Sequence, residues 1–256
     1  AQVLANKGYF SKKYPMNSKG EAGDALRTFC REFGVPEHLT FDGSKEQNGK
    51  KTEFMSQIRK NDINYKTSEK GYHNQNPVEG CIRELRRKWY RVMVRKRVPV
   101  RFWDYGMKWV SEIQSLTHTN SGGIDETPLC KITGETPDIS EYIDFGFYDK
   151  VMFHDNAGMG PRYPGRWLGV SHHTGNLMSY HILTKRGKVV SRSSVQRVTE
   201  LELQTTEFKE IFKEYDEAVQ KRIGDEKCFT GDKAKVEDWA EFAADPDFVE
   251  EFQKSS

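Results

Sequence analysis

Hydrophobic and polar positions at the start of the chain predict two strands, a helix and a third strand. Residues 1–5 and 8–15 have the residue types of short β-strands, and the two can pair as antiparallel neighbours. A capping-box pattern, Ser18 to Glu21, precedes apolar residues at helical spacing, and Gly34 is placed to end the helix. A β-prone run then leads to Asp42. This order predicts a mixed α/β sheet.

The next elements are short and separated by polar loops. Phe54, Met55 and Ile58 predict a short helix, and residues 63–66 predict another strand. Polar loops follow Asp42 and precede residue 77. Their side chains could meet nucleic acid, but ordinary solvation of a loop explains them equally well.

A long helix begins near Asn76, which can act as its N-cap, with Pro77 at the first helical position. We expect it to end near Val98–Pro99. Its predicted core stripe is Ile82, Leu85, Trp89 and Val92. A second amphipathic helix is predicted from residue 102 to about 116, with Trp103, Val110, Ile113 and Leu116 in the core and Trp109 also a packing residue.

Basic residues dominate the long helix. Residues 83–101 hold nine basic side chains and one acid. A charged run is commonly a solvated face, but aromatic residues among the arginines and an acid at the helix start favour a phosphodiester backbone as partner. The predicted nucleic-acid-binding residues are Lys45, Gln75, Asn76, Arg83, Arg86, Arg87, Tyr90 and Arg91.

Two carboxylates are candidates for catalysis. Asp42 follows a β-prone run and precedes Gly43, which predicts an exposed carboxylate at a strand end. Glu79 shares one helix face with Arg83, Arg86, Arg87 and Tyr90. Such acids can hold a divalent metal at a reacting phosphorus. For Glu79 a second interpretation stays open, in which it closes a capping box and opposes the helix dipole.

The second half of the chain changes character. Residues 121–146 are rich in turn formers, and short β-like runs at 149–154, 166–170, 178–183 and 188–192 predict a small barrel. From Glu207 on, one amphipathic helix is expected in an acidic segment, and residues 232–252 are expected to be partly disordered.

Composition narrows the function classes. Residues 200–256 hold 17 acids and 8 bases, a net charge of −9, which leaves +11 for residues 1–199. A basic body favours a polyanionic partner. The four cysteines are far apart without a Cys-x-x-Cys pair, which predicts reduced thiols and disfavours zinc. No apolar run or N-terminal pattern predicts a membrane span or signal peptide, so we expect an intracellular protein.

Asp42 and Glu79 are separated by 36 residues, and Glu79 lies within Gln-Asn-Pro-Val-Glu ahead of the basic helix. This arrangement resembles the catalytic core of retrotransposon and retroviral integrases. The downstream order Thr127-Pro128, Gly134, Pro137, Phe145-Gly146 resembles the linker of copia-type elements. The β-runs from Gly165 to Val195 are similar to the SH3-like domain that follows the core there.

The resemblance implies an RNase H-like α/β core at 1–120, truncated at its N-terminus, a linker at 121–146, an SH3-like β-barrel domain at 147–202, and an acidic tail or linker at 203–256. It implies a two-metal site for Mg²⁺ or Mn²⁺, with Asp42 as the second acid and Glu79 as the third. The first acid would lie ahead of residue 1, since Asp24 belongs to the predicted helix. The chain departs from the family pattern at Gly43 and Pro77, where Asn and Gly are usual.

Two functions therefore remain open. The first is an integrase-type polynucleotidyl transferase that acts on element ends and target DNA as a homo-oligomer, located in the nucleus or in a cytoplasmic particle. With only two of three acids, this chain is expected to be weak or inactive by itself. The second is a non-catalytic nucleic-acid-binding module derived from such an element.

Overall fold

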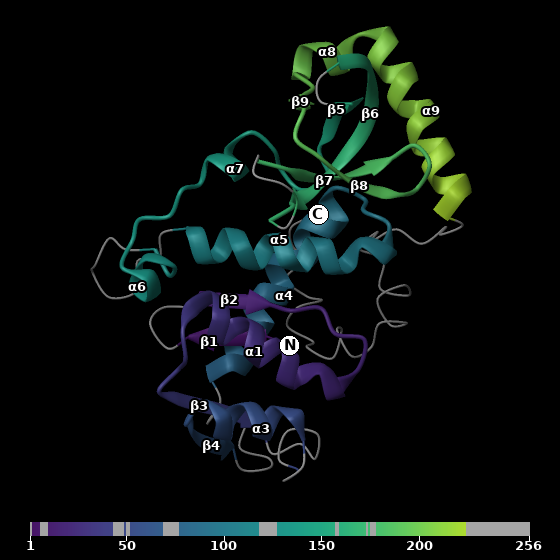
Figure 1. Cartoon of the computed structure of the whole chain (residues 1–256). Coiled ribbons are helices and arrows are strands. Elements are labelled where there is room, and N and C mark those ends of the chain that lie inside the picture. Colours follow the sequence, from purple (N-terminus) through teal and green to yellow (C-terminus); the bar gives the residue numbers. More distant parts are fainter. Residues whose placement is uncertain are drawn as a thin grey trace, which may run out of the picture. The chain divides into compact units, whose positions relative to one another are not determined.

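The structure is a computed structural model that describes residues 2–5, 10–42, 49, 52–68, 77–117, 127–156, 159–172, 174 and 178–223 (Figure 1). It divides into two compact units. Unit 1 comprises Ala1–Leu85 and Ser111–Pro137, and unit 2 comprises Arg86–Val110 and Asp138–Ser256. Each unit is therefore built from two separate stretches of chain.

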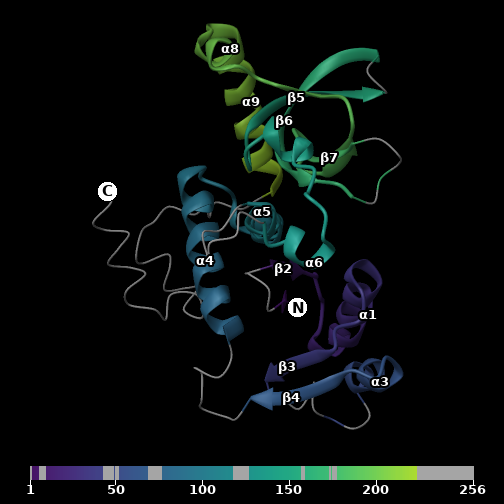
Figure 2. The ribbon, with the colours of Figure 1, turned by 90° about the vertical axis from the view of Figure 1, so that its left-hand side faces the viewer.

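Unit 1 has the predicted mixed α/β character. Strands β1 (Gln2–Ala5) and β2 (Phe10–Lys13) pair antiparallel, as expected from their sequence. Helix α1 (Ala22–Phe33) follows, and strands β3 (His38–Asp42) and β4 (Asn64–Ser68) pair parallel with α3 (Glu53–Lys60) between them in the chain. Figure 2 shows both arrows of this pair pointing the same way.

The start of α1 differs from the predicted capping box. A short 3₁₀ turn, η1 (Lys19–Glu21), precedes the helix, and no side chain caps its N-terminus. The carboxylate of Glu21 instead accepts a hydrogen bond from the backbone N–H of Asn17 at 2.9 Å. Gly34 ends the helix as predicted, with a φ of +92° that glycine adopts without strain.

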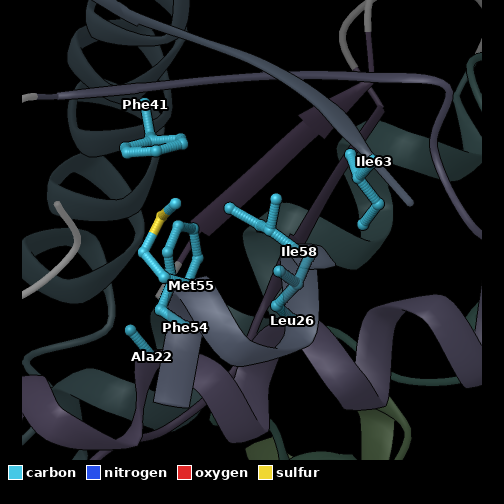
Figure 3. Packing of buried hydrophobic residues seen from close by; sticks show 7 residues of the cluster. All are labelled: Ala22, Leu26, Phe41, Phe54, Met55, Ile58 and Ile63. Atoms are coloured by element: carbon cyan, nitrogen blue, oxygen red, sulfur yellow. The ribbon is translucent and has the colours of Figure 1, made fainter. Parts of the chain in front are cut away.

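The core of unit 1 joins α1, β3, α3 and the residue before β4. Figure 3 shows seven buried side chains packed together, namely Ala22, Leu26, Phe41, Phe54, Met55, Ile58 and Ile63. Phe54, Met55 and Ile58 were the apolar positions of the predicted short helix, and all three are buried. The crossover helix thus fixes the parallel pair that ends at Asp42.

A second contact in unit 1 uses three buried serines. The Ser11 backbone N–H donates to Ser115 Oγ at 3.2 Å, and the Ser11 backbone carbonyl accepts from the hydroxyls of Ser111 and Ser115 at 2.9 and 3.1 Å. Ser111 and Ser115 are one turn apart on α5 (Trp103–Leu116). These bonds hold β2 against the C-terminal half of α5. The short helix α6 (Cys130–Thr133) completes the unit.

Unit 2 contains a five-stranded antiparallel sheet in the order β8-β7-β6-β5-β9. The strands are β5 (Lys150–Asn156), β6 (Met159–Val170), β7 (Tyr180–Thr184), β8 (Val189–Arg192) and β9 (Val195–Arg197). In the part of the chain described, β8 and β9 are its edges and do not pair, so no closed barrel is present. Helix α7 (Ser140–Ile143) precedes the sheet.

Two further helices follow the sheet. Thr199 and Glu202 form a capping box at the start of α8 (Glu200–Gln204), and α9 (Thr206–Ile223) is the amphipathic helix expected after Glu207. The Tyr215 hydroxyl donates to the Leu183 carbonyl at 2.6 Å, and Arg166 forms an ion pair with Asp216 at 2.7 Å. Residues 206–223 are thus attached to the sheet rather than forming a free linker. Residues 232–252 lie outside the described part.

Cys30, Cys81 and Cys130 are free thiols, in agreement with the sequence, while Cys228 lies outside the described residues. None of the helices in the described ranges combines the length and apolar character needed to cross a membrane.

The long helix α4 (Pro77–Arg95) begins at Pro77 as predicted but ends before Val98. The N–H groups of Arg97 and Val98 donate back to the carbonyls of Val94 and Met93, each at 3.0 Å. Arg97 has a φ of +49°, so the ending is a Schellman motif with arginine at the position that favours glycine. This backward turn ends the helix ahead of the proline.

Arg97→Gly is therefore expected to raise the free energy of unfolding by about 1 kcal/mol, because glycine adopts this conformation without a Cβ clash. Urea titration followed by circular dichroism measures the change. The matched control is Arg91→Gly in the exposed middle of the same helix, which should lower stability by about 1 kcal/mol. A loss of stability in both variants would contradict this account of the helix end.

Candidate carboxylate site and nucleic-acid interface

Asp42 lies at the carboxyl end of β3, as predicted. Its backbone is in register with Ser68, the last residue of the parallel neighbour β4. The preceding residue, Phe41, is buried, with its ring 5.0 Å from that of Phe54 and 5.7 Å from that of Tyr65. This packing fixes the strand up to the residue before the carboxylate. The Asp42 side chain itself lies outside the described atoms.

Glu79 is the third residue of α4 and belongs to unit 1, as does Asp42. A carboxylate in the first turn of a helix faces the positive end of the helix dipole, whether or not it also binds a metal. The Glu79 side chain is not described, and Asn76, the predicted N-cap, lies outside the described residues. Both interpretations of Glu79 therefore stay predictions.

The helix after Glu79 buries one stripe and exposes the basic residues. Leu85 and Trp89 are buried as predicted, but the stripe continues through Cys81 and Met93, while Ile82 and Val92 are only half-buried. The buried positions recur every four residues, so the stripe lies to one side of the predicted one. Arg83, Arg86 and Arg91 are exposed, and Arg87 is half-buried.

Tyr90 does not share the environment of the arginines. It lies on the same helix face as Arg83 and Arg86, yet only 8% of its surface is exposed. Burial raises the pKa of its phenol above the ordinary value. The sequence groups Tyr90 with these arginines as a nucleic-acid-binding residue, and that role stays a prediction. Its burial was not foreseen, because helical spacing gives the direction of a side chain but not which segments cover it.

The other end of the basic run is a tight turn between α4 and α5. The 3₁₀ turn η3 (Val100–Phe102) leads into α5, and Arg95, Lys96, Arg97 and Arg101 are all exposed. Trp103 is 42% exposed, so its predicted place in the core is wrong. Its backbone carbonyl accepts a hydrogen bond from the buried Trp89 indole at 3.0 Å, which fixes the backbone while the ring stays at the surface.

No family model and no curated protein matches the chain. Solved structures similar to the chain include one whose matching chain has 13% identity and a TM-score of 0.34, over 74% of this chain and 69% of that chain. That structure is a cryoEM structure of the simian T-cell lymphotropic virus intasome in complex with PP2A regulatory subunit B56 gamma. A likeness this low establishes no family, so any functional proposal rests on the residues of this chain.

The remaining predicted contacts and the metal site are not tested by the geometry. Lys45, Gln75 and Asn76 lie outside the described residues. Within the described ranges, no group of three or more His, Cys, Asp or Glu side chains could hold a metal ion. Since the carboxylates of Asp42 and Glu79 are not among the described atoms, their proposed ligand role stays a prediction.

Sequence reasoning missed the α4–α5 turn as a basic surface distinct from the helix face. The signal was present, because residues 95–103 contain four basic residues, no acid and a tryptophan. Helical periodicity predicts only which residues share a face of a helix. These side chains are brought together instead by the positive φ of Arg97 and by the 3₁₀ turn that follows it.

Proposed function

We propose that the chain is the catalytic core and following β-domain of a copia-type retrotransposon integrase, a polynucleotidyl transferase that joins element DNA 3′ ends to target DNA. The observation that carries the proposal is the placement of the two acids. Asp42 ends a strand with a parallel neighbour, and Glu79 lies in the first turn of α4. The exposed residues Arg83, Arg86 and Arg91 follow Glu79 on the same helix.

The donor set of the proposed site suits Mg²⁺ or Mn²⁺, because carboxylate oxygens are the ligands that these cations prefer. When bound, two such ions would stabilise the charge on the entering and leaving oxygens of an in-line displacement. Asp42 and Glu79 would hold the ions. Arg83, Arg86 and Arg91 would hold phosphates of the DNA backbone through charge-assisted hydrogen bonds.

The β-sheet of unit 2 supports the second part of the proposal. Strands β5 to β8 are successive neighbours, and β9 returns to pair with β5, which suits a small SH3-like domain at residues 147–202. A homo-oligomer on DNA, in the nucleus or in a cytoplasmic particle, is part of the same proposal.

One observation bears on the alternative of a nucleic-acid-binding module without catalysis. Before Asp42 the only aspartate is Asp24, which lies on α1 and forms an ion pair with Arg27 at 2.6 Å. Asp24 is therefore a residue of a helix surface rather than of a strand end. Among aspartates, residues 1–41 offer no other candidate for the first acid of the proposed two-metal site, which in that proposal lies ahead of residue 1.

A salt titration of duplex DNA binding tests the DNA interface. The variant Arg83→Ala/Arg86→Ala, which removes two of these exposed arginines, should reduce the slope of log K against log salt concentration by about two units, because two phosphate contacts are lost. The matched control, Arg31→Ala/Lys60→Ala, removes two exposed basic residues that are not on α4 and should leave the slope near the wild-type value. An equal slope in wild type and the α4 variant would make the basic run a solvated face.

The same titration with and without Mn²⁺ tests the carboxylates. Wild type should bind DNA more tightly with the metal, and Glu79→Gln should lose that gain. If the α4 variant changes the slope while Glu79→Gln keeps the full metal-dependent gain, the binding module is favoured over the transferase.

A further inference from the structure

The turn between α4 and α5 is a basic surface with an exposed aromatic residue at its end. Residues 95–103 carry a charge of +4 and no acid. The Lys96 ammonium pairs with Asp149 at 2.6 Å, so one of the four charges has a partner in the fold. Arg95, Arg97 and Arg101 are exposed, as is 42% of Trp103. Such a surface suits a polyanion that also carries aromatic groups.

Helix α9 ends at this surface. The Arg101 guanidinium donates from Nη1 to the backbone carbonyl of Ile223, the last residue of α9, at 3.5 Å. The helix is fixed along its length by the buried Tyr215 hydroxyl on the Leu183 carbonyl and by the Arg166–Asp216 pair. The point at which residue 224 is attached to α9 therefore lies next to Arg101.

The sequence that begins there has the complementary composition. Residues 224–256, called the acidic segment below, hold ten acids and four bases, a net charge of −6. They also contain aromatic residues among the acids, namely Phe229, Trp239, Phe242, Phe248 and Phe252. These residues lie outside the described part of the chain. The inference about them therefore rests on their composition and on where they are attached to α9.

We propose that the acidic segment binds the α4–α5 turn of its own chain, with carboxylates on Arg95, Arg97 and Arg101 and an aromatic side chain against Trp103. A segment tethered next to its binding surface has an effective concentration of about 1 mM, so even a weak contact is formed most of the time. Phosphate groups of a nucleic acid bind the same guanidinium groups through charge-assisted hydrogen bonds. The segment therefore competes with nucleic acid at this end of the basic run, whether or not the protein is a transferase.

The contact can be measured without any nucleic acid. We would label the five tryptophans with 5-fluorotryptophan and assign the Trp103 resonance by Trp103→Phe. Changing all ten carboxylates between residues 225 and 251 to amides should shift this resonance, as should raising salt from about 50 to about 500 mM. Trp167 is buried and serves as an internal control whose resonance should not move. An unchanged Trp103 resonance in the amide variant would overturn the proposal.

Competition is measured by duplex DNA binding in a double-mutant cycle. The amide variant should bind DNA about tenfold more tightly at low salt, because it loses a competitor present at millimolar effective concentration. In the background Arg95→Gln/Arg97→Gln/Arg101→Gln that gain should disappear. A gain of equal size in both backgrounds would mean general charge repulsion and would refute the proposed contact.

The two measurements separate this proposal from the proposed function. If no variant binds DNA, the integrase interpretation fails, and the fluorine resonance still decides the intramolecular contact. If the Trp103 resonance moves only when DNA is added and not in the amide variant, the turn binds nucleic acid rather than the acidic segment, and the present proposal is wrong.

Discussion

Gly23→Ala is expected to destabilise the protein by about 3 kcal/mol or more, although alanine is the better helix former. Gly23 is the second residue of α1, where that helix crosses the start of α3. A Cβ at this position would lie 2.7 Å from the carbonyl carbon of Glu53 and 2.8 Å from the backbone nitrogen of Phe54. Because backbone atoms cannot rotate away, the two helices must separate. The shared core in Figure 3 would then lose contacts on both sides.

The matched control is Gly80→Ala, at another helical glycine. Among the described residues outside its own stretch of helix, no atom lies within 4 Å of a Cβ built on Gly80, so we expect only helix propensity to change and stability to rise by about 0.5–1 kcal/mol. Urea unfolding of both variants measures the two changes in the free energy of unfolding, which should have opposite signs. A stabilising Gly23→Ala would show that α1 and α3 are further apart than described here.

Tyr215→Phe should cost about 1–3 kcal/mol at neutral pH. The Tyr215 side chain is fully buried, and its hydroxyl donates to the Leu183 carbonyl at 2.6 Å. The variant removes the donor and leaves the carbonyl without this bond. Tyr163→Phe is the matched control, because 41% of Tyr163 is exposed and its hydroxyl can reach water. It should change stability by less than about 0.5 kcal/mol.

The same variant has a signature at high pH. Burial raises the pKa of Tyr215 well above its ordinary value, so the folded protein keeps the phenol proton where the unfolded chain loses it. The contribution of the protonated Tyr215 phenol to the free energy of unfolding is complete below about pH 10. Above that pH it falls by about 1.4 kcal/mol per pH unit. Tyr215→Phe should therefore lose less stability between neutral and alkaline pH than wild type. If the free energies of unfolding of wild type and Tyr215→Phe fell in parallel at alkaline pH, the buried, protonated phenol would be contradicted.

Several helices and strands of unit 1 could be predicted from the sequence, because the residues that specify them lie within the elements themselves. The strands β3 and β4, the short helix α3 and the first residue of α4 are as the β-prone runs, the apolar spacing within residues 54–58 and Pro77 predict, whereas the parallel pairing of the two strands was not predicted. Asp42 could be placed at a strand end from the glycine that follows it. The acids could be found by type and position, but their ligand role depends on side-chain geometry that no pattern contains.

The sequence was insufficient where a distant segment decides the environment of a side chain. Tyr90 lies on the arginine face but is covered, and Trp103 has core spacing but is exposed. Their periodicity is the same whichever element packs beside them. The attachment of α9 to the sheet could not be predicted either. In the sequence, Tyr215 and Asp216 are only a tyrosine and an acid of an amphipathic helix. Their partners, the Leu183 carbonyl and Arg166, are identified only by the structure.

The buried serine contact has a consequence for synthesis on the ribosome. Ser11 waits for partners that are 100 and 104 residues later in the chain, whereas the cluster of α1, β3 and α3 is complete once Ile63 has emerged. Because domains fold as their residues become available, β2 lacks these partners while α5, the helix that carries Ser111 and Ser115, is still being made. Pausing during translation between residues 68 and 115 would therefore leave β2 without its helix partner and accessible to chaperones.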